Sequence, residues 1–176
     1  MKRHKKIRLI VEISLLVALA ISLSYIDKMI STLIFPTLPG AKIGFSNLIV
    51  LFAICNYRFR ESIIVALLKS VVAGLILSGI TTFIIGGTAT LVSFLLMYFA
   101  NKYLNQKISM VGISLIGGFS HTLTQLIVVM LIYDLGYVVF SYGLSLITIS
   151  LVTSIIIGLV TIRTNQLYQN SINTKE

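Results

Sequence analysis

Long runs of apolar residues, separated by short polar or basic clusters, make up most of the chain. A helix that crosses the hydrocarbon core of a bilayer needs about 20 mostly apolar residues. We therefore expect six membrane-spanning helices, over about 7–26, 41–57, 62–79, 83–104, 108–133 and 137–162. The pattern predicts an all-α integral membrane protein, a six-transmembrane-helix bundle that forms one transmembrane domain over 1–176.

The segment 27–40, between the first two expected spans, contains both prolines of the chain, Pro36 and Pro39. Proline fixes φ and has no N–H, so this segment is not expected to cross the membrane as a helix. It is nevertheless apolar, and non-helical backbone beside lipid must be covered by protein or lie at the interface. We expect 27–40 to be a capping extracellular loop that folds over the helix ends.

The composition supports a single membrane domain, because 57% of the 176 residues are hydrophobic and 11% are charged, with a mean hydropathy of +1.01. The formal net charge of +9 would suggest nucleic acid in a soluble protein. In the six-span topology, however, eleven of the 14 lysines and arginines lie on one side. This distribution follows the positive-inside rule. We expect both termini in the cytoplasm, lipid around the bundle and no nucleic-acid partner.

The first span could be a cleaved signal peptide, since Ala18-Leu19-Ala20 resembles a cleavage site. Glu12 interrupts the apolar run and hydrophobicity continues to Ile26, so we expect the span to be retained. Glu12 is placed to pair with Arg8, one helical turn away.

Three small residues on the first span, Ser14, Ala18 and Ser22, recur at every fourth position and therefore share one face. Small residues allow a second helix to approach closely. The stripe is interpreted either as packing inside the bundle or as an interface with a partner protein.

Lys69 lies near the middle of the third expected span. Ionisable residues inside a membrane are costly and mark functional sites. The lysine could hold an anionic ligand, or its amine could extend towards the cytoplasmic interface and carry no function. Lys42, at the base of the loop, is a second lysine outside the cytoplasmic segments.

Ser114, Gly118, His121 and Gln125 form a polar and small face on the fifth span. We expect this face to point into the bundle, where it would bind a ligand or form hydrogen bonds between helices. A single histidine without other ligands at metal-binding spacing predicts no metal site.

Motifs for enzymatic chemistry are not found in the sequence. No Walker loop is present, and the two aspartates, Asp27 and Asp134, are too far apart in sequence to suggest the clustered carboxylates that hold a metal. We expect no catalytic activity, no metal and no cofactor.

Residues 39–47 read Pro-Gly-Ala-Lys-Ile-Gly-Phe-Ser-Asn. This motif resembles the P-G-x-K-[LI]-G-[LF]-[AS]-N signature of a bacterial membrane family, called the Gx transporter family or heptaprenyl diphosphate synthase component I. Lys69, the Gly86-Gly87 pair and the segment from Gly117 to Gln125 resemble further family features. The family is similar to the substrate-binding S-components of energy-coupling factor (ECF) transporters.

The resemblance implies six helices, a loop over the ligand and a first helix whose small residues face a transmembrane coupling subunit. It predicts a subunit in the bacterial plasma membrane that captures a small metabolite, for which an anion is one expectation, with partner proteins and their ATPases supplying energy. The alternative is a non-transporting subunit of a membrane complex in polyprenyl diphosphate, quinone or flavin-linked redox metabolism. The expected substrate-binding residues are Lys42, Asn47, Lys69, Gly86, Gly87, His121 and Gln125.

Overall fold

The computed structural model describes residues 2–34, 36, 42–76, 79–133 and 136–173. These ranges are helical throughout, apart from short connections, and contain no strand. The elements are α1 (Lys2–Ile34), α2 (Asn47–Asn56), α3 (Phe59–Val71), the π-helical segment η1 (Val72–Ile76), α4 (Ile80–Leu104), α5 (Met110–Tyr133) and α6 (Gly136–Asn173). The prediction of an all-α protein is confirmed.

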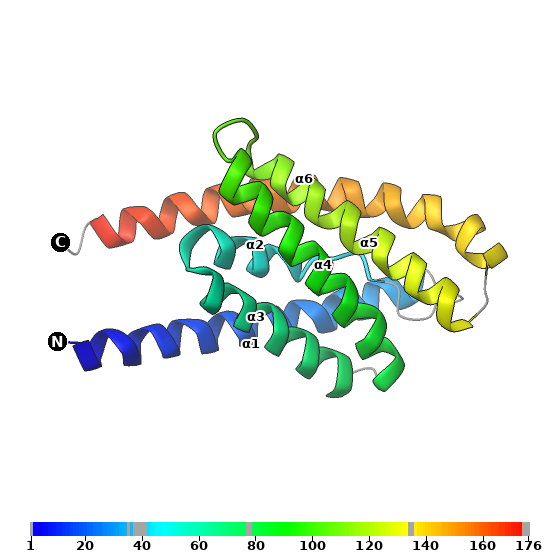
Figure 1. The fold of residues 1–176 in the computed structure, drawn as a ribbon, viewed down its shortest axis with the longest axis horizontal. Helices are drawn as coiled ribbons and strands as arrows, with labels where there is room; N and C mark the ends of the chain where they lie inside the picture. The colour runs from blue at the N-terminus through cyan, green and yellow to red at the C-terminus, as the bar shows by residue number, and fades with distance from the viewer. Residues whose placement is uncertain (1, 35, 37–41, 77–78, 134–135, 174–176) are drawn as a thin grey trace.

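In Figure 1, α1 and α6 run along the long axis of the molecule, and α1 begins at the same end at which α6 finishes. Helices α4, α5 and α6 pack side by side in that order, and α3 lies against α1 and α4. The short helix α2 contacts each of the other α-helices. Its residues Val50, Leu51 and Ile54 are buried against Phe94 and Met97 of α4, so α2 forms the centre of the hydrophobic core.

Four helices, α1, α4, α5 and α6, are long and apolar enough to cross a membrane. The expected second span over 41–57 is wrong in its first part, because α2 begins only at Asn47. Gly44 has φ of +104°, a conformation that does not continue a right-handed helix. The 10 residues of α2 rise about 15 Å, about half the thickness of a hydrocarbon core.

The expected boundary between the first span and the loop is also wrong, because α1 continues to Ile34 instead of ending at Ile26. Residues 27–34 include no proline or glycine, and Thr32 bonds to the carbonyl of Lys28 within the helix. The first proline follows at Pro36, and a proline disfavours helical geometry in the residue before it. Of the expected cap over 27–40, residues 35 and 37–40 lie outside the described part of the chain.

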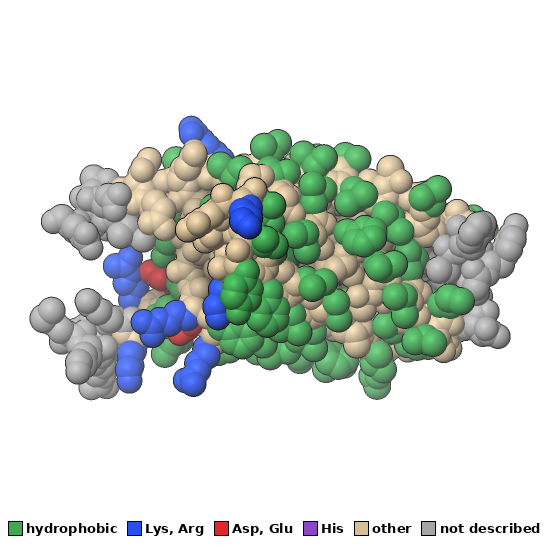
Figure 2. Space-filling view, turned by 45° about the horizontal axis from the view of Figure 1, so that its top comes forward, with side chains coloured by type: hydrophobic (Ala, Val, Ile, Leu, Met, Phe, Trp, Pro, Cys, Tyr) green, Lys and Arg blue, Asp and Glu red, His purple; other side chains and the backbone are tan. Residues whose placement is uncertain are grey.

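Charged side chains gather at the end of the bundle where α1 begins and α6 finishes, and hydrophobic side chains cover much of the rest of the face in Figure 2. At this end Arg8 forms the expected ion pair with Glu12, at 2.8 Å. Tyr57 donates a hydrogen bond to the same carboxylate, at 3.1 Å. The arrangement fits a membrane protein with one strongly basic end.

The polar face of α5 points into the bundle, as expected: Ser114, His121 and Gln125 are all buried. Glycines bring the neighbouring helices close to this face. A Cβ on Gly117 would lie 2.3 Å from the Met97 sulfur, and one on Gly118 would lie 1.8 Å from Ser154 Oγ. The absence of side chains at these positions therefore allows α4 and α6 to pack tightly against α5.

The small-residue stripe of α1 lies on the outside. Ser14, Ala18 and Ser22 are exposed, whereas Val17 and Ala20 are buried against the rest of the bundle. The interpretation of the stripe as internal packing is therefore wrong.

Candidate functional site

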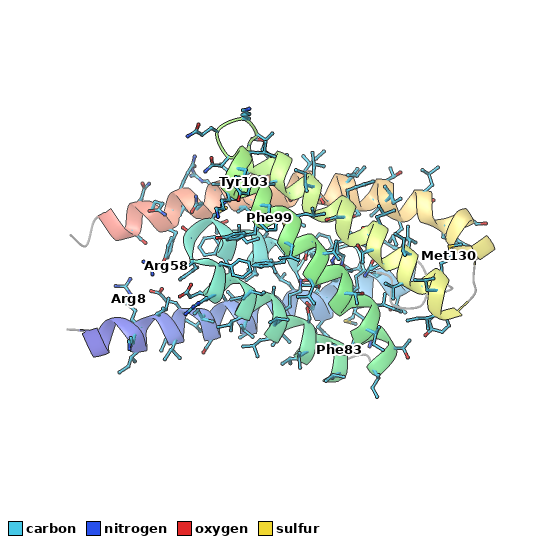
Figure 3. All side chains as sticks on the ribbon, in the orientation of Figure 1. Arg8, Arg58, Phe83, Phe99, Tyr103 and Met130 are labelled. Atoms are coloured by element: carbon cyan, nitrogen blue, oxygen red, sulfur yellow. The ribbon has the colours of Figure 1, made fainter. Side chains whose placement is uncertain are left out.

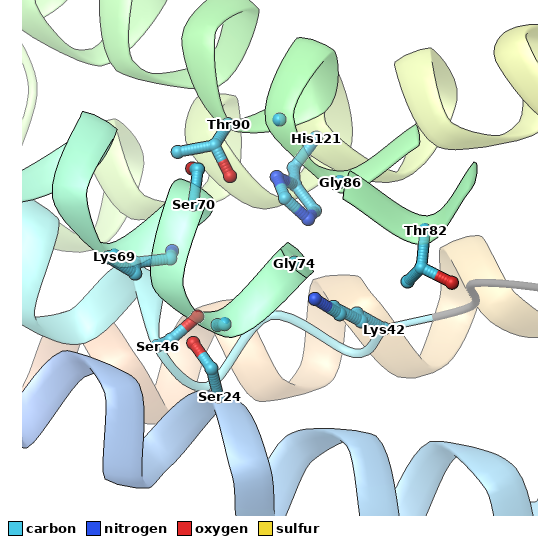
Figure 4. Close-up of a pocket in the computed structure, with 12 residues that line it drawn as sticks. Ser24, Lys42, Ser46, Lys69, Ser70, Gly74, Thr82, Gly86, Thr90 and His121 are labelled. Carbon is cyan, nitrogen blue, oxygen red and sulfur yellow. The ribbon is translucent and has the colours of Figure 1, made fainter. Parts of the chain in front are cut away.

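A polar cavity lies between α1, the segment before α2, the end of α3 with η1, and helices α4 and α5 (Figure 4). Its lining consists of lysine, histidine, hydroxyl and small residues: Ser24, Lys42, Ser46, Lys69, Ser70, Ala73, Gly74, Thr82, Gly86, Gly87, Thr90 and His121. The cavity volume is about 10 Å³, on the scale where a single water molecule occupies about 10–15 Å³. In this conformation the cavity is therefore about large enough for one water molecule.

Lys69 reaches the cavity from the last turn of α3 and is only 4% exposed. Its amine donates a hydrogen bond of 3.0 Å to Oδ1 of Asn47, the first residue of α2. Figure 4 shows the amine directed into the bundle. Lys69 therefore does not extend to the cytoplasmic interface.

Lys42 enters the cavity from the extended segment before α2 and is also buried. Its backbone N–H lies 3.4 Å from Oε1 of Gln125 on α5. The next two residues, Ile43 and Gly44, donate backbone hydrogen bonds to the carboxylate of Asp27 on α1, at distances of 2.9 to 3.2 Å. These contacts hold the segment against α1 and α5.

Asp27 is fully buried, and its two oxygens accept from backbone N–H groups. Within the described residues, neither Lys42 nor Lys69 forms an ion pair with it or with another carboxylate. Burying an ammonium group is costly unless hydrogen bonds or a counter-charge compensate it. The cavity therefore holds two buried lysine amines that have no direct carboxylate partner among the described residues.

Two buried nitrogen atoms beside the lysines have no hydrogen-bond partner among the described residues: Nδ1 of His121 and Nδ2 of Asn47. Unsatisfied buried polar atoms are rare in folded proteins and call for an explanation. His121 is fixed by its place on the tightly packed face of α5 and points into the cavity (Figure 4). A ligand that accepts or donates hydrogen bonds would satisfy these atoms.

The glycine pair on α4 leaves space for the Lys42 side chain. A Cβ on Gly86 would lie 3.4 Å from Lys42 Nζ, and Gly86 itself is buried. Gly87 also lines the cavity, on the side towards α3. The pair therefore forms part of the α4 wall of the site, together with Thr82 and Thr90.

A family model for heptaprenyl diphosphate synthase component I matches residues 16–164, which include every residue that lines the cavity. The chain belongs to the heptaprenyl diphosphate synthase component I family. No curated protein and no solved structure matches the chain. The family resemblance carried by the motif at 39–47, Lys69 and the glycine pairs is thus confirmed under this description.

In this family member, five of the seven expected site residues line one cavity: Lys42, Lys69, Gly86, Gly87 and His121. The other two, Asn47 and Gln125, lie directly behind the lysines. Asn47 accepts from the Lys69 amine, and Gln125 accepts from the Lys42 backbone. The expected residues are therefore brought together, with Asn47 and Gln125 as positioning groups.

Sequence reasoning missed the hydroxyl groups of the cavity and the role of Asp27. Ser46 and Ser70 each adjoin an expected site residue in sequence, which could have identified them. Ser24, Thr82 and Thr90 have no such signal. Asp27 was noted only as one of two distant aspartates, although a carboxylate within an apolar helix is itself a functional candidate.

The arrangement is suited to holding an anion. Two lysine amines meet there, and hydroxyl groups and the His121 imidazole surround them as hydrogen-bond partners. Within the described residues no group of three or more His, Cys, Asp or Glu side chains is placed to hold a metal ion.

Proposed function

We propose that this chain is a membrane-embedded capture subunit that binds a small anionic metabolite between Lys42 and Lys69 and relies on partner proteins for energy. The observation that carries this proposal is the meeting of two buried lysine amines in one cavity, while the nearby Asp27 carboxylate accepts from backbone N–H groups. An anion would compensate both ammonium groups at once.

The size of the cavity implies that capture involves two conformations. A space of about 10 Å³ is too small for a metabolite, so the ligand would enter when part of the lining moves. The segment that carries Lys42 is the best candidate, because it is not helical and its backbone is held to α1 and α5 by the side chains of Asp27, Ser31 and Gln125. In the proposed topology of six crossings, with both termini cytoplasmic, this segment faces the outside of a bacterial plasma membrane.

The proposed partner surface is the exposed stripe of Ser14, Ala18 and Ser22 on α1. α1 buries the smallest share of its residues among the four long helices, so much of its surface is open to lipid or protein. Small side chains would let a transmembrane coupling subunit approach the α1 backbone. ATPases bound to that subunit would supply the energy, because this sequence has no nucleotide-binding loop.

A second candidate function is favoured by the family description. A component I of heptaprenyl diphosphate synthase is by that name one part of a larger assembly. On this alternative the chain is a non-transporting membrane subunit in polyprenyl diphosphate, quinone or flavin-linked metabolism, and its anion would be handed to another subunit. ATP-dependent uptake with co-expressed coupling proteins supports the first function, and partner enzyme activity that depends on this chain without uptake supports the second.

The test of anion capture is native mass spectrometry of the purified full-length protein, which detects a co-purified small molecule. We expect an anionic compound to be retained by the wild type and lost from Lys42→Met and from Lys69→Met. Lys107→Met removes the same charge from an exposed position outside the cavity and should retain the compound. Retention by both cavity variants would contradict the proposal.

A further inference from the structure

A second hollow, the groove between α3 and α4, adjoins the polar cavity. It has a volume of about 210 Å³ and is lined by Leu67, Ser70, Val71, Phe83, Ile84, Gly87, Thr88 and Leu91. Leu67, Val71, Ile84 and Leu91 are each 36–44% exposed, so the groove opens on the outer surface of the bundle. In a membrane this surface faces hydrocarbon.

The two hydroxyl groups of the groove are used within their own helices. Ser70 donates to the carbonyl of Ala66 at 2.8 Å, and Thr88 donates to the carbonyl of Ile84 at 2.7 Å. The remaining lining side chains are apolar, so the groove offers little to a polar ligand and suits a hydrocarbon chain.

Two residues, Ser70 and Gly87, line both the groove and the polar cavity. Phe83 lies at the same boundary and packs on two glycines of the cavity wall, Gly74 and Gly87. A Cβ on Gly74 would lie 2.8 Å from the nearest Phe83 atom, and a Cβ on Gly87 would lie 3.6 Å from the nearest Phe83 atom. Figure 3 marks Phe83 near the outer end of α4, away from the chain termini. The partition between cavity and groove is therefore one aromatic ring packed on two glycines.

The backbone beside this partition departs from an α-helix. η1 is π-helical over Val72–Ile76 and includes Gly74, against which Phe83 packs. Single π-helical turns occur often at functional sites. Gly74 lets Phe83 pack closely on this turn, so a change of the Phe83 rotamer would open the boundary between cavity and groove.

We propose that the anion held by Lys42 and Lys69 is the headgroup of an amphipathic ligand, whose hydrocarbon chain passes Phe83 and lies in the groove between α3 and α4. This inference rests on the proposed capture of an anion. It accounts for a cation-rich cavity that adjoins a lipid-facing apolar groove, two features that a fully water-soluble metabolite would not require. The lysines fit a phosphate or carboxylate headgroup, and the groove holds one hydrocarbon chain. The ligand is therefore a single-chain phosphate or carboxylate amphiphile.

The test compares ligands that share a headgroup and differ in the chain. Full-length protein in phosphatidylcholine nanodiscs is titrated with methyl phosphate and dodecyl phosphate, and with acetate and dodecanoate. We expect either dodecyl phosphate or dodecanoate to bind at least about tenfold more tightly than the short-chain anion with the same headgroup, because the groove adds contacts to the chain. Lys69→Met should weaken both members of that pair.

A bulky residue in the groove separates binding there from simple partitioning into the bilayer. Leu91→Trp, and Leu67→Trp from the facing helix, should weaken long-chain binding by about tenfold or more and leave short-chain binding unchanged. Leu95→Trp is the matched control, since Leu95 lies one turn along α4, is 39% exposed against 36% for Leu91, and does not line the groove.

Equal effects of Leu91→Trp and Leu95→Trp on long-chain binding would overturn the inference. They would indicate that ordinary bilayer lipid fills the groove. Equal affinity for long and short ligands would also overturn it, while anion capture would stand. Failure of all four anions to bind the wild type would contradict anion capture itself.

Discussion

The Asp27 carboxylate accepts two hydrogen bonds from the backbone N–H of Gly44, at 3.2 Å and 2.9 Å to its two oxygens. A third, from the N–H of Ile43, measures 2.9 Å. The side chain thereby fastens the segment before α2 to the middle of the bundle. Lys42, one residue earlier, is held at the cavity by this contact.

Asp27→Asn should loosen the segment, because an amide group has one accepting oxygen where the carboxylate has two. We expect the free energy of unfolding to fall by about 1–3 kcal/mol, since a backbone donor is left unsatisfied in the interior. A lower Tm in detergent and weaker anion binding would show this. Thr32→Ala is the control, because the Thr32 hydroxyl bonds within α1, to the carbonyl of Lys28, and the change should have a smaller effect. An unchanged Tm in Asp27→Asn would contradict the fastening role.

Gly44→Ala tests the backbone conformation at the same place. Gly44 has φ of +104°, which a residue with a Cβ adopts at a cost of about 1–2 kcal/mol. We expect a lower Tm and weaker anion binding together, because the strained segment positions Lys42. Gly112→Ala, in helix α5, is a control without this strain and should leave binding unchanged. Equal Tm values for the two variants would contradict the expectation.

Much of this fold was predictable because a helix that crosses a membrane appears in the sequence as an apolar run of about 20 residues. The spans expected at 83–104 and 108–133 differ by only a few residues from α4 and α5. Lys69 and His121 were found because ionisable residues stand out in apolar runs. These predictions needed no knowledge of how the helices pack.

What could not be predicted depends on contacts between segments. Asp27 accepts hydrogen bonds from Ile43 and Gly44, which lie 16 and 17 positions further along the chain. No local sequence pattern predicts contacts at this separation. α2 starts late because Gly44 takes a left-handed conformation that the sequence permits but does not demand. The cavity hydroxyls of Thr82 and Thr90 look like ordinary helical threonines until α3 and α5 pack beside them.

The proposed topology predicts opposite accessibility for the two ends of the bundle. In a Cys55→Ser background, Leu33→Cys should react with a membrane-impermeant thiol reagent in intact cells, since Leu33 is 84% exposed at the outer end of α1. Asn105→Cys, in the exposed turn after α4, should react only after the cells are broken. Reaction of Asn105→Cys in intact cells would contradict the six-span topology.

Ala18→Trp should prevent a partner helix from approaching α1, because the indole would fill the space above the small-residue stripe. We expect the complex with a coupling subunit to be lost on co-purification, while anion binding by the isolated chain is kept. Leu131→Trp places the same ring on α5, where Leu131 is 79% exposed, and should leave the complex intact. A complex that survives Ala18→Trp would remove the stripe from the partner interface.

His121→Phe distinguishes a ligand-binding histidine from a structural one by its effect on anion affinity. The substitution keeps a ring at this position and removes both ring nitrogens: Nδ1, a buried atom with no partner among the described residues, and the nitrogen that bonds to the Ala89 backbone. Loss of the contact to Ala89 is destabilising, so we expect a lower Tm without ligand.

Anion binding by His121→Phe should also weaken by about tenfold, which corresponds to one lost hydrogen bond to the ligand. Ser114→Ala, two turns away on the same buried face and outside the cavity lining, is the control and should leave affinity unchanged. If the imidazole served only to join α5 to α4 through Ala89, the Tm would fall and anion affinity would be preserved. Titration calorimetry and thermal melting of the same three preparations would separate the two outcomes.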